Sequence, residues 1–447
     1  MALPNISDQQ NERLISSDFG IADVQQKEST VKYVDDVSRN KSVEQNNLQS
    51  ITSIKSTDRS RPQIETPTSV VQVGFFEGAR QHWNYGHIFQ SPVSPRTCKC
   101  TSYERKFDAV VTLEKNEART GKYELLFIPH DVSVSPMKHH VWNKILSVAP
   151  PHQRRVYATF EGSWKLRHLA ASLATPYRRK AFHWSLTHHS RSDFAQPYGY
   201  YQPFQVSKTS TKEKPLKNWA EGKSGFIAWM STWSQTSWKR ANFVEKLQKH
   251  IPVHFYGHQY RDCPRNSKSC ENKIRGYKFY LALENSCCGE YITEKFWRTL
   301  SWDIVPVVLG AQRDDYERLA PPHSFIFIDD FSSMADLADY LRLLDKNDNL
   351  YNEYFRWKGT GEIHLNYPPI HEKSVRSKTP PEGFFYSCSA VCRVSEKYLS
   401  IQEPHDSLRV DHQPKSTNVT YFDPNVNWWC GSCQKCGKHQ WVRDFNL

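Results

Sequence analysis

The residues best suited to chemistry lie in segment 277–302, which reads YKFYLALENSCCGEYITEKFWRTLSW. An apolar run ends at Glu284 and Asn285, a loop of small residues follows, and a helix is expected from about Thr293. Such a strand-to-helix junction lies at the carboxyl edge of an α/β sheet, where ligands bind. Peptide N–H groups, the Thr293 hydroxyl and the Lys295 ammonium would meet at that helix start and could hold a diphosphate.

The same helix start also has a purely structural interpretation. Thr293 followed by Glu294 is a common N-cap with an acidic residue in the first turn, a pattern that stabilises many helices. A carboxylate repels phosphate, so beside a bound diphosphate Glu294 would bind sugar hydroxyls instead. The residues alone leave both interpretations open.

Two glutamates in the first half of the chain follow short apolar runs and precede a glycine. Glu161 stands in YATFEGSW, and Glu77 comes just before Gly78. A carboxylate at the end of a strand could accept the proton of an attacking hydroxyl. An ordinary exposed loop glutamate explains Glu161 equally well, and Glu77 is the rival carboxylate.

These residues must be positioned by an α/β framework, which the apolar pattern predicts. Strands are expected at 70–76, 108–113, 123–129, 155–160, 182–186, 225–230, 252–256, 277–283, 304–309 and 325–328. Helices are expected around 238–247, from about 293, and over 337–344, where Ser333 and Asp336 resemble a capping box. In the second half the alternation predicts a Rossmann-like domain with a parallel sheet.

Composition separates this framework from a very polar segment. The chain has 447 residues, 59 Lys and Arg against 47 Asp and Glu, and many aromatic residues. Its mean hydropathy is only −0.70. Residues 1–68 are rich in Ser, Gln, Asn, Asp and Lys, and we expect a disordered stem or linker there, with a regulatory tail as the alternative.

The net charge of +12 is mild for this length and suits a phosphate-bearing small molecule. No RNA- or DNA-binding module occurs, so we expect no nucleic-acid partner. No run of 18 apolar residues and no signal-peptide core occurs in the sequence as given. The expected domains are 69–205 and 223–372, joined by a Lys-rich linker at 206–222 and followed by a Cys-rich extension at 373–447.

Eleven cysteines and N-x-S/T sequons at Asn5, Asn40 and Asn418 favour the secretory pathway. The run Cys430, Cys433, Cys436 and His439 could ligate zinc, but its four members lie too close together for an ordinary structural zinc site, so disulfides are the preferred interpretation.

We also expect a loop-closing Cys263–Cys270 bridge, and partners elsewhere or burial for the adjacent Cys287 and Cys288. The histidine pairs 139–140 and 188–189 are expected to be surface or core residues and not ligands. The odd cysteine count leaves one thiol over unless it bonds to another chain.

The segments YKFYLALENSCCGEYITEKFWR and VPVVLGAQRDDYERLAPPHSFIFIDDFSS resemble the α1,3/4-fucosyltransferase family of glycosyltransferases, whose pattern reads YKFYLAFENS, YITEK and VPVVLG in this order. The resemblance runs over roughly residues 70–360 and is stronger in the second half. Segments 355–362, 388–394 and 428–430 resemble most the invertebrate and plant branch that fucosylates the N-glycan core.

The resemblance implies a GT-B fold, in which two Rossmann-like domains enclose the active site, and an inverting transfer of L-fucose from GDP-β-L-fucose to GlcNAc of glycoprotein glycans. The acceptor would be the core GlcNAc of an N-glycan, or else an antennary Lewis or LacdiNAc GlcNAc. An inactive relative that binds glycans is the remaining alternative. The family requires no metal, so Asp329–Asp330 is interpreted as the end of a strand and not as a metal site. Stimulation of the activity by Mn²⁺ is left open.

Residue by residue, the resemblance assigns the donor site to Lys295 and Arg240 for the diphosphate, Tyr291 near the phosphates, Glu294 for the ribose and Asn285 near the fucose. Lys239 is the competitor for the role of Arg240. Glu161 matches the catalytic base, and Glu77, Trp184 and Asp193 are candidates on the acceptor side.

Some positions depart from the family pattern. His183 replaces an Asn, and His188 stands near a usual Tyr, which bears on acceptor choice. The family also implies the luminal side of the Golgi membrane and a membrane anchor. That anchor is missing from this sequence, and either a truncated sequence or a soluble form would explain this.

Overall fold

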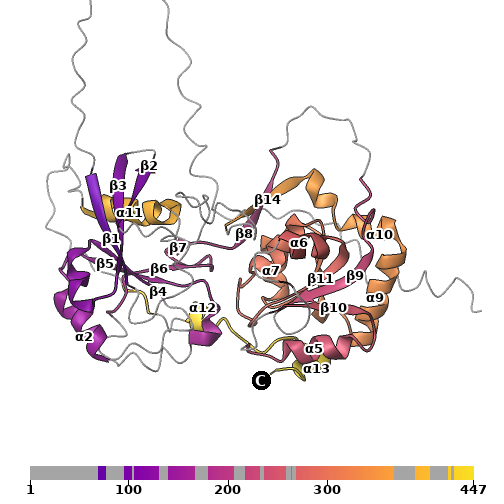
Figure 1. The fold of residues 1–447 in the computed structure, drawn as a ribbon. Helices are drawn as coiled ribbons and strands as arrows, with labels where there is room; N and C mark the ends of the chain where they lie inside the picture. The colour runs from indigo at the N-terminus through magenta and orange to yellow at the C-terminus, as the bar shows by residue number, and fades with distance from the viewer. Residues whose placement is uncertain are drawn as a thin grey trace, which may run out of the picture. The chain divides into compact units, whose positions relative to one another are not determined.

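A computed structural model describes residues 69–76, 95–102, 105–129, 139–166, 180–205, 217–231, 236–257, 263, 268–366, 388–402, 421–423 and 427–446 (Figure 1). All of them belong to one unit, Glu65–Leu447. The expected stem at 1–68 lies outside the described residues.

The first sheet has seven strands in the order β2-β3-β1-β4-β5-β6-β7. Their bounds are β1 Ser69–Phe76, β2 Arg96–Thr101, β3 Lys106–Glu114, β4 Leu125–Pro129, β5 Arg154–Ala158, β6 Trp184–Thr187 and β7 Phe194–Ala195. Every neighbouring pair is parallel except β2 with β3. The antiparallel edge strand was not predicted, because RTCKCT buries only its two cysteines and carries a weak apolar signal.

The second sheet has five parallel strands in the order β10-β9-β11-β12-β13. They are β9 Gly225–Met230, β10 Val253–Tyr256, β11 Tyr277–Leu283, β12 Val305–Leu309 and β13 Ile326–Phe327. Every residue of β11 and β12 is buried, as expected for central strands covered on both faces. Each predicted strand in both halves overlaps an observed one.

Helices cover these sheets, and short segments connect them. The α-helices are α2 His139–Val148, α5 Arg240–Leu247, α6 Lys268–Arg275, α7 Glu294–Ser301, α8 Arg313–Leu319, α9 Met334–Lys346, α10 Asp348–Glu353, α11 Cys388–Gln402, α12 Asn427–Cys430 and α13 Gln440–Arg443. The 3₁₀ segments are η1 Glu117–Lys122, η2 Ser163–Leu166, η3 Ile328–Asp330 and η4 Arg356–Gly359. Strands β8 Gly199–Pro203 and β14 Gly361–Leu365 form a separate antiparallel pair.

The predicted cap of α9 is confirmed. Ser333 has an extended backbone, and its side-chain oxygen accepts a hydrogen bond from the Asp336 N–H at 3.1 Å. That bond satisfies one of the N–H groups left without a partner at a helix start.

The chain beyond residue 372 regains regular structure, contrary to our expectation that it has no periodic apolar pattern. Helix α11 buries Val391, Val394 and Tyr398 and packs against β2 (Figure 1). Two disulfides, Cys98–Cys388 and Cys100–Cys392, link the same two elements. The apolar spacing was obscured by the small and polar residues of this helix.

The remaining disulfides are Cys263–Cys270, Cys287–Cys436 and Cys288–Cys433. The predicted Cys263–Cys270 bridge is confirmed, and so is the disulfide interpretation of Cys433 and Cys436. Every cysteine whose side chain is described is paired.

The expected α/β class with two Rossmann-like sheets is confirmed. Helices in the described part of the chain are all too short or too polar to span a bilayer.

Candidate functional site

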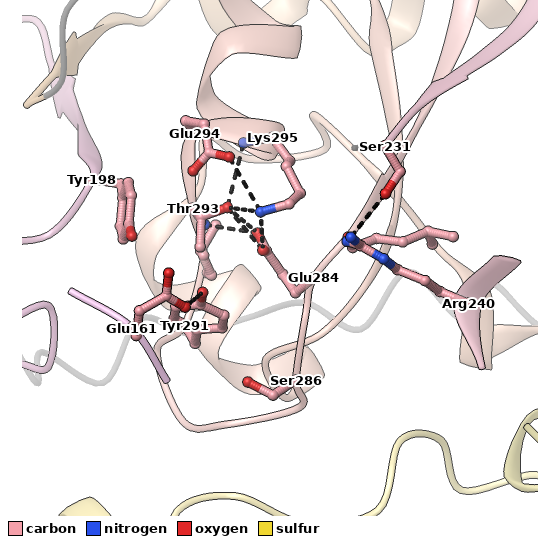
Figure 2. A network of polar contacts seen from close by, with 12 residues as sticks. Glu161, Tyr198, Ser231, Arg240, Glu284, Ser286, Tyr291, Thr293, Glu294 and Lys295 are labelled. Atoms are coloured by element: carbon pink, nitrogen blue, oxygen red, sulfur yellow. Dashed lines mark hydrogen bonds and ion pairs between the residues drawn. The ribbon is translucent and has the colours of Figure 1, made fainter. Parts of the chain in front are cut away.

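The junction between β11 and α7 places a buried carboxylate beside a helix start. Glu284 follows the last residue of β11 and is fully buried. It accepts hydrogen bonds from the Thr293 N–H at 2.8 Å and from the Thr293 hydroxyl. Thr293 is the N-cap of α7, so the structural interpretation of this residue is correct. Its hydroxyl nevertheless belongs to a charged cluster (Figure 2).

Lys295 lies at the centre of that cluster. Its Nζ is 3.0 Å from Glu284 Oε2, 3.2 Å from Glu294 Oε1 and 2.8 Å from Thr293 Oγ1. The ammonium is mostly buried, and Figure 2 shows it directed into the cluster between the two carboxylates. A buried charge held in this way is oriented before any ligand arrives.

The three charged groups shift one another's pKa. Burial raises the pKa of Glu284, although the Lys295 ammonium opposes this shift. Burial also works against the charge of Glu294, but Lys295 and Arg298 overcome it and lower its pKa to about 2. For Lys295, burial favours the neutral amine, and the two carboxylates outweigh it and raise its pKa. Lys295 is therefore a cation and Glu294 an anion at neutral pH.

A second cation lies at the start of α5. Arg240 is buried, and its guanidinium donates to the Leu283 carbonyl at 3.0 Å and to Ser231 Oγ at 2.9 Å. Burial lowers the pKa of Arg240, with Glu284 opposing, and the charge of Arg240 in turn opposes the rise in the pKa of Lys295. The competitor, Lys239, is exposed. The burial and direction of Arg240 favour it over Lys239 for the paired cation.

A carboxylate from the first sheet meets a tyrosine from the loop before α7. Glu161 follows β5, and its Oε2 accepts a hydrogen bond from the Tyr291 hydroxyl at 3.1 Å. Figure 2 shows the two side chains in contact, with Thr293, Glu294 and Lys295 nearby. The structure thus brings the predicted base to the predicted donor loop.

Close backbone approach fixes this contact. A Cβ added to Gly162 would lie 2.6 Å from Ser286 Oγ and 3.1 Å from Cys288 Sγ. Only a glycine lets the chain after Glu161 pass so near the loop. The Tyr198 hydroxyl also donates to the Phe160 carbonyl at 2.9 Å, which holds the residue before Glu161.

Tyr291 is a neutral donor in this arrangement. Burial raises its pKa well above the usual value, and the charge of Glu161 raises it further. The hydroxyl therefore keeps its proton and directs it to Glu161. Glu161 is only partly buried, so solvent or an acceptor can reach this side of the site.

Asn285 and Glu290 border the same loop. The side-chain carbonyl of Asn285 is buried and has no hydrogen-bond partner among the described residues, so it is available to a ligand. Glu290 has a φ of 54°, and its carboxylate accepts from the Ser190 N–H at 2.6 Å and from Arg318 at 2.8 Å. These contacts hold a strained residue just before Tyr291.

The acceptor-side candidates are not part of this cluster. Glu77 lies outside the described residues. Trp184 is buried against Phe194, with ring centroids 5.8 Å apart. Asp193 accepts from the Ser185 N–H at 2.9 Å and from its hydroxyl. Both have structural partners, and their acceptor roles stay predictions.

The histidines and the aspartate pair also have structural surroundings. His188 and His189 are buried, as is His183, whose Nδ1 accepts from the Arg155 N–H at 2.9 Å. Asp329 accepts from the N–H groups of Lys438 and His439. No group of three or more His, Cys, Asp or Glu among the described residues could hold a metal ion.

Sequence reasoning missed Glu284 and Glu290 as site residues. The sequence analysis treats Glu284 only as the end of a strand. A signal for its role was present, because this carboxylate follows an apolar run and precedes the Thr-Glu-Lys start of a helix. Glu290 carries no local signal, because its partners, Ser190 and Arg318, are far away in the sequence.

The second half of the chain, which contains the β11–α7 junction, is similar to known proteins. Residues 220–406 match the family model described as glycosyltransferase family 10 (fucosyltransferase) C-term. Glycoprotein 3-alpha-L-fucosyltransferase A of Drosophila melanogaster is 40% identical over 191 residues, which cover 42% of this chain and 38% of that protein. These matches confirm the resemblance drawn from the sequence motifs.

Human relatives match to a similar degree. The 3-galactosyl-N-acetylglucosaminide 4-alpha-L-fucosyltransferase FUT3 of Homo sapiens is 37% identical over 217 residues, 48% of this chain and 56% of that protein. The FUT5 protein of Homo sapiens, a 4-galactosyl-N-acetylglucosaminide 3-alpha-L-fucosyltransferase, is 36% identical over 248 residues, 52% of this chain and 62% of that protein. The chain thus spans between about two fifths and three fifths of these relatives.

A solved structure of an alpha1,3-fucosyltransferase with GDP-fucose is also similar. It is 14% identical and has a TM-score of 0.42, and the match covers 81% of this chain and 96% of that one.

Proposed function

We propose that this chain, whose residues 220–406 form a glycosyltransferase family 10 (fucosyltransferase) C-terminal domain, is an inverting α1,3-fucosyltransferase. The donor is GDP-β-L-fucose, and the acceptor is GlcNAc of a glycoprotein glycan. The observation that carries the proposal is the hydrogen bond between Tyr291 and Glu161, because it brings a carboxylate of the first sheet to the cationic donor loop of the second.

In the proposed reaction Glu161 accepts the proton of the GlcNAc hydroxyl as that oxygen attacks C1 of fucose. Attack from the face opposite GDP inverts the configuration at C1, and the bond from C1 to the diphosphate oxygen breaks. Lys295, Arg240 and the N–H groups at the start of α7 stabilise the charge left on the diphosphate. Glu294 faces the ribose, and Asn285 faces the fucose.

Within this function we propose the core GlcNAc of N-glycans as the acceptor. The name of the Drosophila relative, a glycoprotein 3-alpha-L-fucosyltransferase, supports it. Motif segments 355–362, 388–394 and 428–430 support the same branch. The second candidate acceptor is an antennary GlcNAc, which the similar identity to 4-galactosyl-N-acetylglucosaminide 3-alpha-L-fucosyltransferases supports.

Mass spectrometry of reaction products tests both proposals. The purified protein is incubated with GDP-fucose and either a GlcNAc-terminated N-glycopeptide or a LacNAc oligosaccharide. Fucose on the innermost GlcNAc is the expected result. Fucose only on the antenna keeps the enzyme class and overturns the acceptor. GDP binding without transfer to either acceptor would favour the glycan-binding relative.

We further propose that the protein works on the luminal side of the Golgi membrane. The five disulfides among the described residues support an oxidising compartment. Microscopy of the tagged protein with a Golgi marker tests this, and a cytosolic or nuclear distribution would contradict it. The proposed reaction does not need a metal, so activity should persist in EDTA. Added Mn²⁺ then shows whether that ion stimulates transfer.

A further inference from the structure

We propose that the C-terminal segment 427–446, here called the brace, is a positioning element of the active site. It holds the chain around Glu161, the loop 285–292 and the start of α5 in the arrangement that transfer requires. This inference rests on the proposed function for its catalytic readout. The brace lies beyond the matched family domain, which ends at residue 406.

The brace is bonded to the donor loop twice. Disulfides join Cys287 to Cys436 and Cys288 to Cys433. Backbone hydrogen bonds add to them, because Gln434 N–H donates to the Cys287 carbonyl at 2.9 Å and Gly289 N–H donates to the Ser432 carbonyl at 3.1 Å. Both disulfides are attached to the loop between Asn285 and Tyr291. They therefore restrict the backbone that carries these two residues of the proposed GDP-fucose site.

The brace also contacts the chain that follows Glu161. The Ser163 hydroxyl donates to the Trp429 carbonyl at 2.6 Å and lies 2.9 Å from Cys433 Sγ. Cys433 is the same cysteine that bonds to Cys288. Cys433 thus contacts Ser163, which follows Glu161 closely in the sequence, and is bonded to Cys288 in the loop that carries Tyr291.

A third set of contacts reaches the start of α5. The N–H of Lys239 donates to the Phe445 carbonyl at 2.6 Å. Phe243 packs against the Phe445 ring, with centroids 5.3 Å apart. Arg240 lies between these two contact points in the sequence. The brace therefore reaches the segments that supply the base, the donor loop and one of the two cations.

Hydrogen bonds within the brace hold its second half, from Cys436 to Asn446, in a fixed conformation. Asn446 Oδ1 accepts from the Cys436 N–H at 2.7 Å, and its side-chain amide donates to the Cys436 carbonyl at 3.0 Å. Asp329 at the end of the second sheet accepts from the His439 N–H at 3.1 Å. The last residue of the brace is thereby bonded to Cys436 near its middle, and His439 is bonded to Asp329, just beyond the last strand of the second sheet.

The test removes one tether in the full chain and measures kinetics and local opening together. The variant Cys288→Ala/Cys433→Ala opens the bridge nearest the Glu161–Tyr291 contact. Its kcat should fall by about 10-fold to 100-fold, because small errors in position cost that much, while the Kd for GDP stays within about threefold. Hydrogen–deuterium exchange should increase in peptides covering 159–164 and 285–292.

The matched control is Cys98→Ala/Cys388→Ala, which opens a bridge between α11 and the edge strand β2. It should keep the wild-type kcat and the wild-type exchange in those two peptides. The milder variant Ser163→Ala keeps all disulfides and should lower kcat by severalfold without changing Kd for GDP.

Three results would overturn the inference. These are an unchanged kcat in the Cys288/Cys433 variant, an equal loss of kcat in the edge control, or no change of exchange at 159–164 and 285–292. If the wild-type protein transfers no fucose at all, the proposed function fails, and the exchange measurement alone then decides whether the brace holds the two loops.

Discussion

The buried ion pair of Lys295 and Glu284 is the residue-scale feature on which the donor site depends. Carboxylates at 3.0 Å and 3.2 Å neutralise the ammonium. Arg240 supplies a second positive charge, and its guanidinium donates to the Leu283 carbonyl and to Ser231 Oγ. The two carboxylates therefore hold Lys295 in a fixed position and compensate its charge.

Removal of the Lys295 ammonium should weaken donor binding. In Lys295→Ala the diphosphate loses a cation that is already oriented, and Glu284 and Glu294 are left to repel it. We expect KM for GDP-fucose to rise by at least about 10-fold, since charge-assisted hydrogen bonds contribute about 1.5–3 kcal/mol. Lys239→Ala is the matched control, because Lys239 is exposed. Equal kinetics for the two variants would refute the donor-site assignment.

His188 predicts how stability depends on pH. Burial lowers its pKa to about 3, against about 6.5 in an unfolded chain. The unfolded chain then takes up a proton below pH 6.5 that the folded protein refuses until about pH 3. Stability is therefore lost as pH falls through this window and is constant above it. His183, whose burial and neighbouring Arg155 lower its pKa to about 3, acts in the same direction.

The variant His188→Phe should remove part of this dependence, because a phenyl ring fills the space between Tyr291 and Trp429 without titrating. Urea unfolding at pH 7.5 and pH 5 measures the effect. The slope should become smaller by up to about 1.4 kcal/mol per pH unit. An unchanged slope would show that His188 does not titrate as the structure indicates.

At this scale the sequence identified most of the cluster. The strand-to-helix junction indicated Thr293, Glu294 and Lys295 but left a purely structural interpretation open, and the family resemblance added Asn285 and Tyr291. Glu290 could not be found, since its role depends on Ser190 and Arg318 from distant elements. The bridges of Cys287 and Cys288 to the chain end are likewise tertiary contacts that no local pattern specifies.

The elements that position the site form for local reasons, and α9 is the clearest example. Ser333 caps its first turn, and Met334, Leu337, Ala338, Leu341 and Leu344 form its buried face. Both features are visible in the sequence, which is why this helix was predicted. Helix α11 was not, because its partner is the edge strand β2 and its small residues gain their burial only there.

The cap of α9 should contribute to stability and not to catalysis. Ser333→Ala removes the acceptor for the Asp336 N–H and should lower the free energy of unfolding by about 1 kcal/mol. Ser333→Asp keeps a side-chain acceptor and should remain near the wild type. Chemical denaturation gives both values, and transfer rates should be equal in all three proteins. A loss as large in Ser333→Asp would argue against the cap.

At the scale of the whole molecule, the framework consists of two sheets and of long-range disulfides, which link β2 to α11 and the loop 285–292 to the brace. The apolar runs were enough to predict the strands and the α/β class, since buried parallel strands are nearly continuous in their apolar residues. Strand order and the long-range disulfide pairings were not predictable, because they join segments up to 292 residues apart. For Cys433 and Cys436 the spacing favoured disulfides over zinc, but only the structure identified their partners, whereas the local Cys263–Cys270 bridge was predicted from the sequence.

The central claim is that Glu161 acts as the base in fucosyl transfer. The most direct measurement compares wild-type protein with Glu161→Gln, using GDP-fucose, the GlcNAc-terminated N-glycopeptide and calorimetric titration of GDP. Glutamine keeps the size and the hydrogen bond to Tyr291 but cannot accept the proton. We predict that kcat falls by about 10²-fold or more while the Kd for GDP stays within about threefold. Normal turnover by Glu161→Gln would contradict the account.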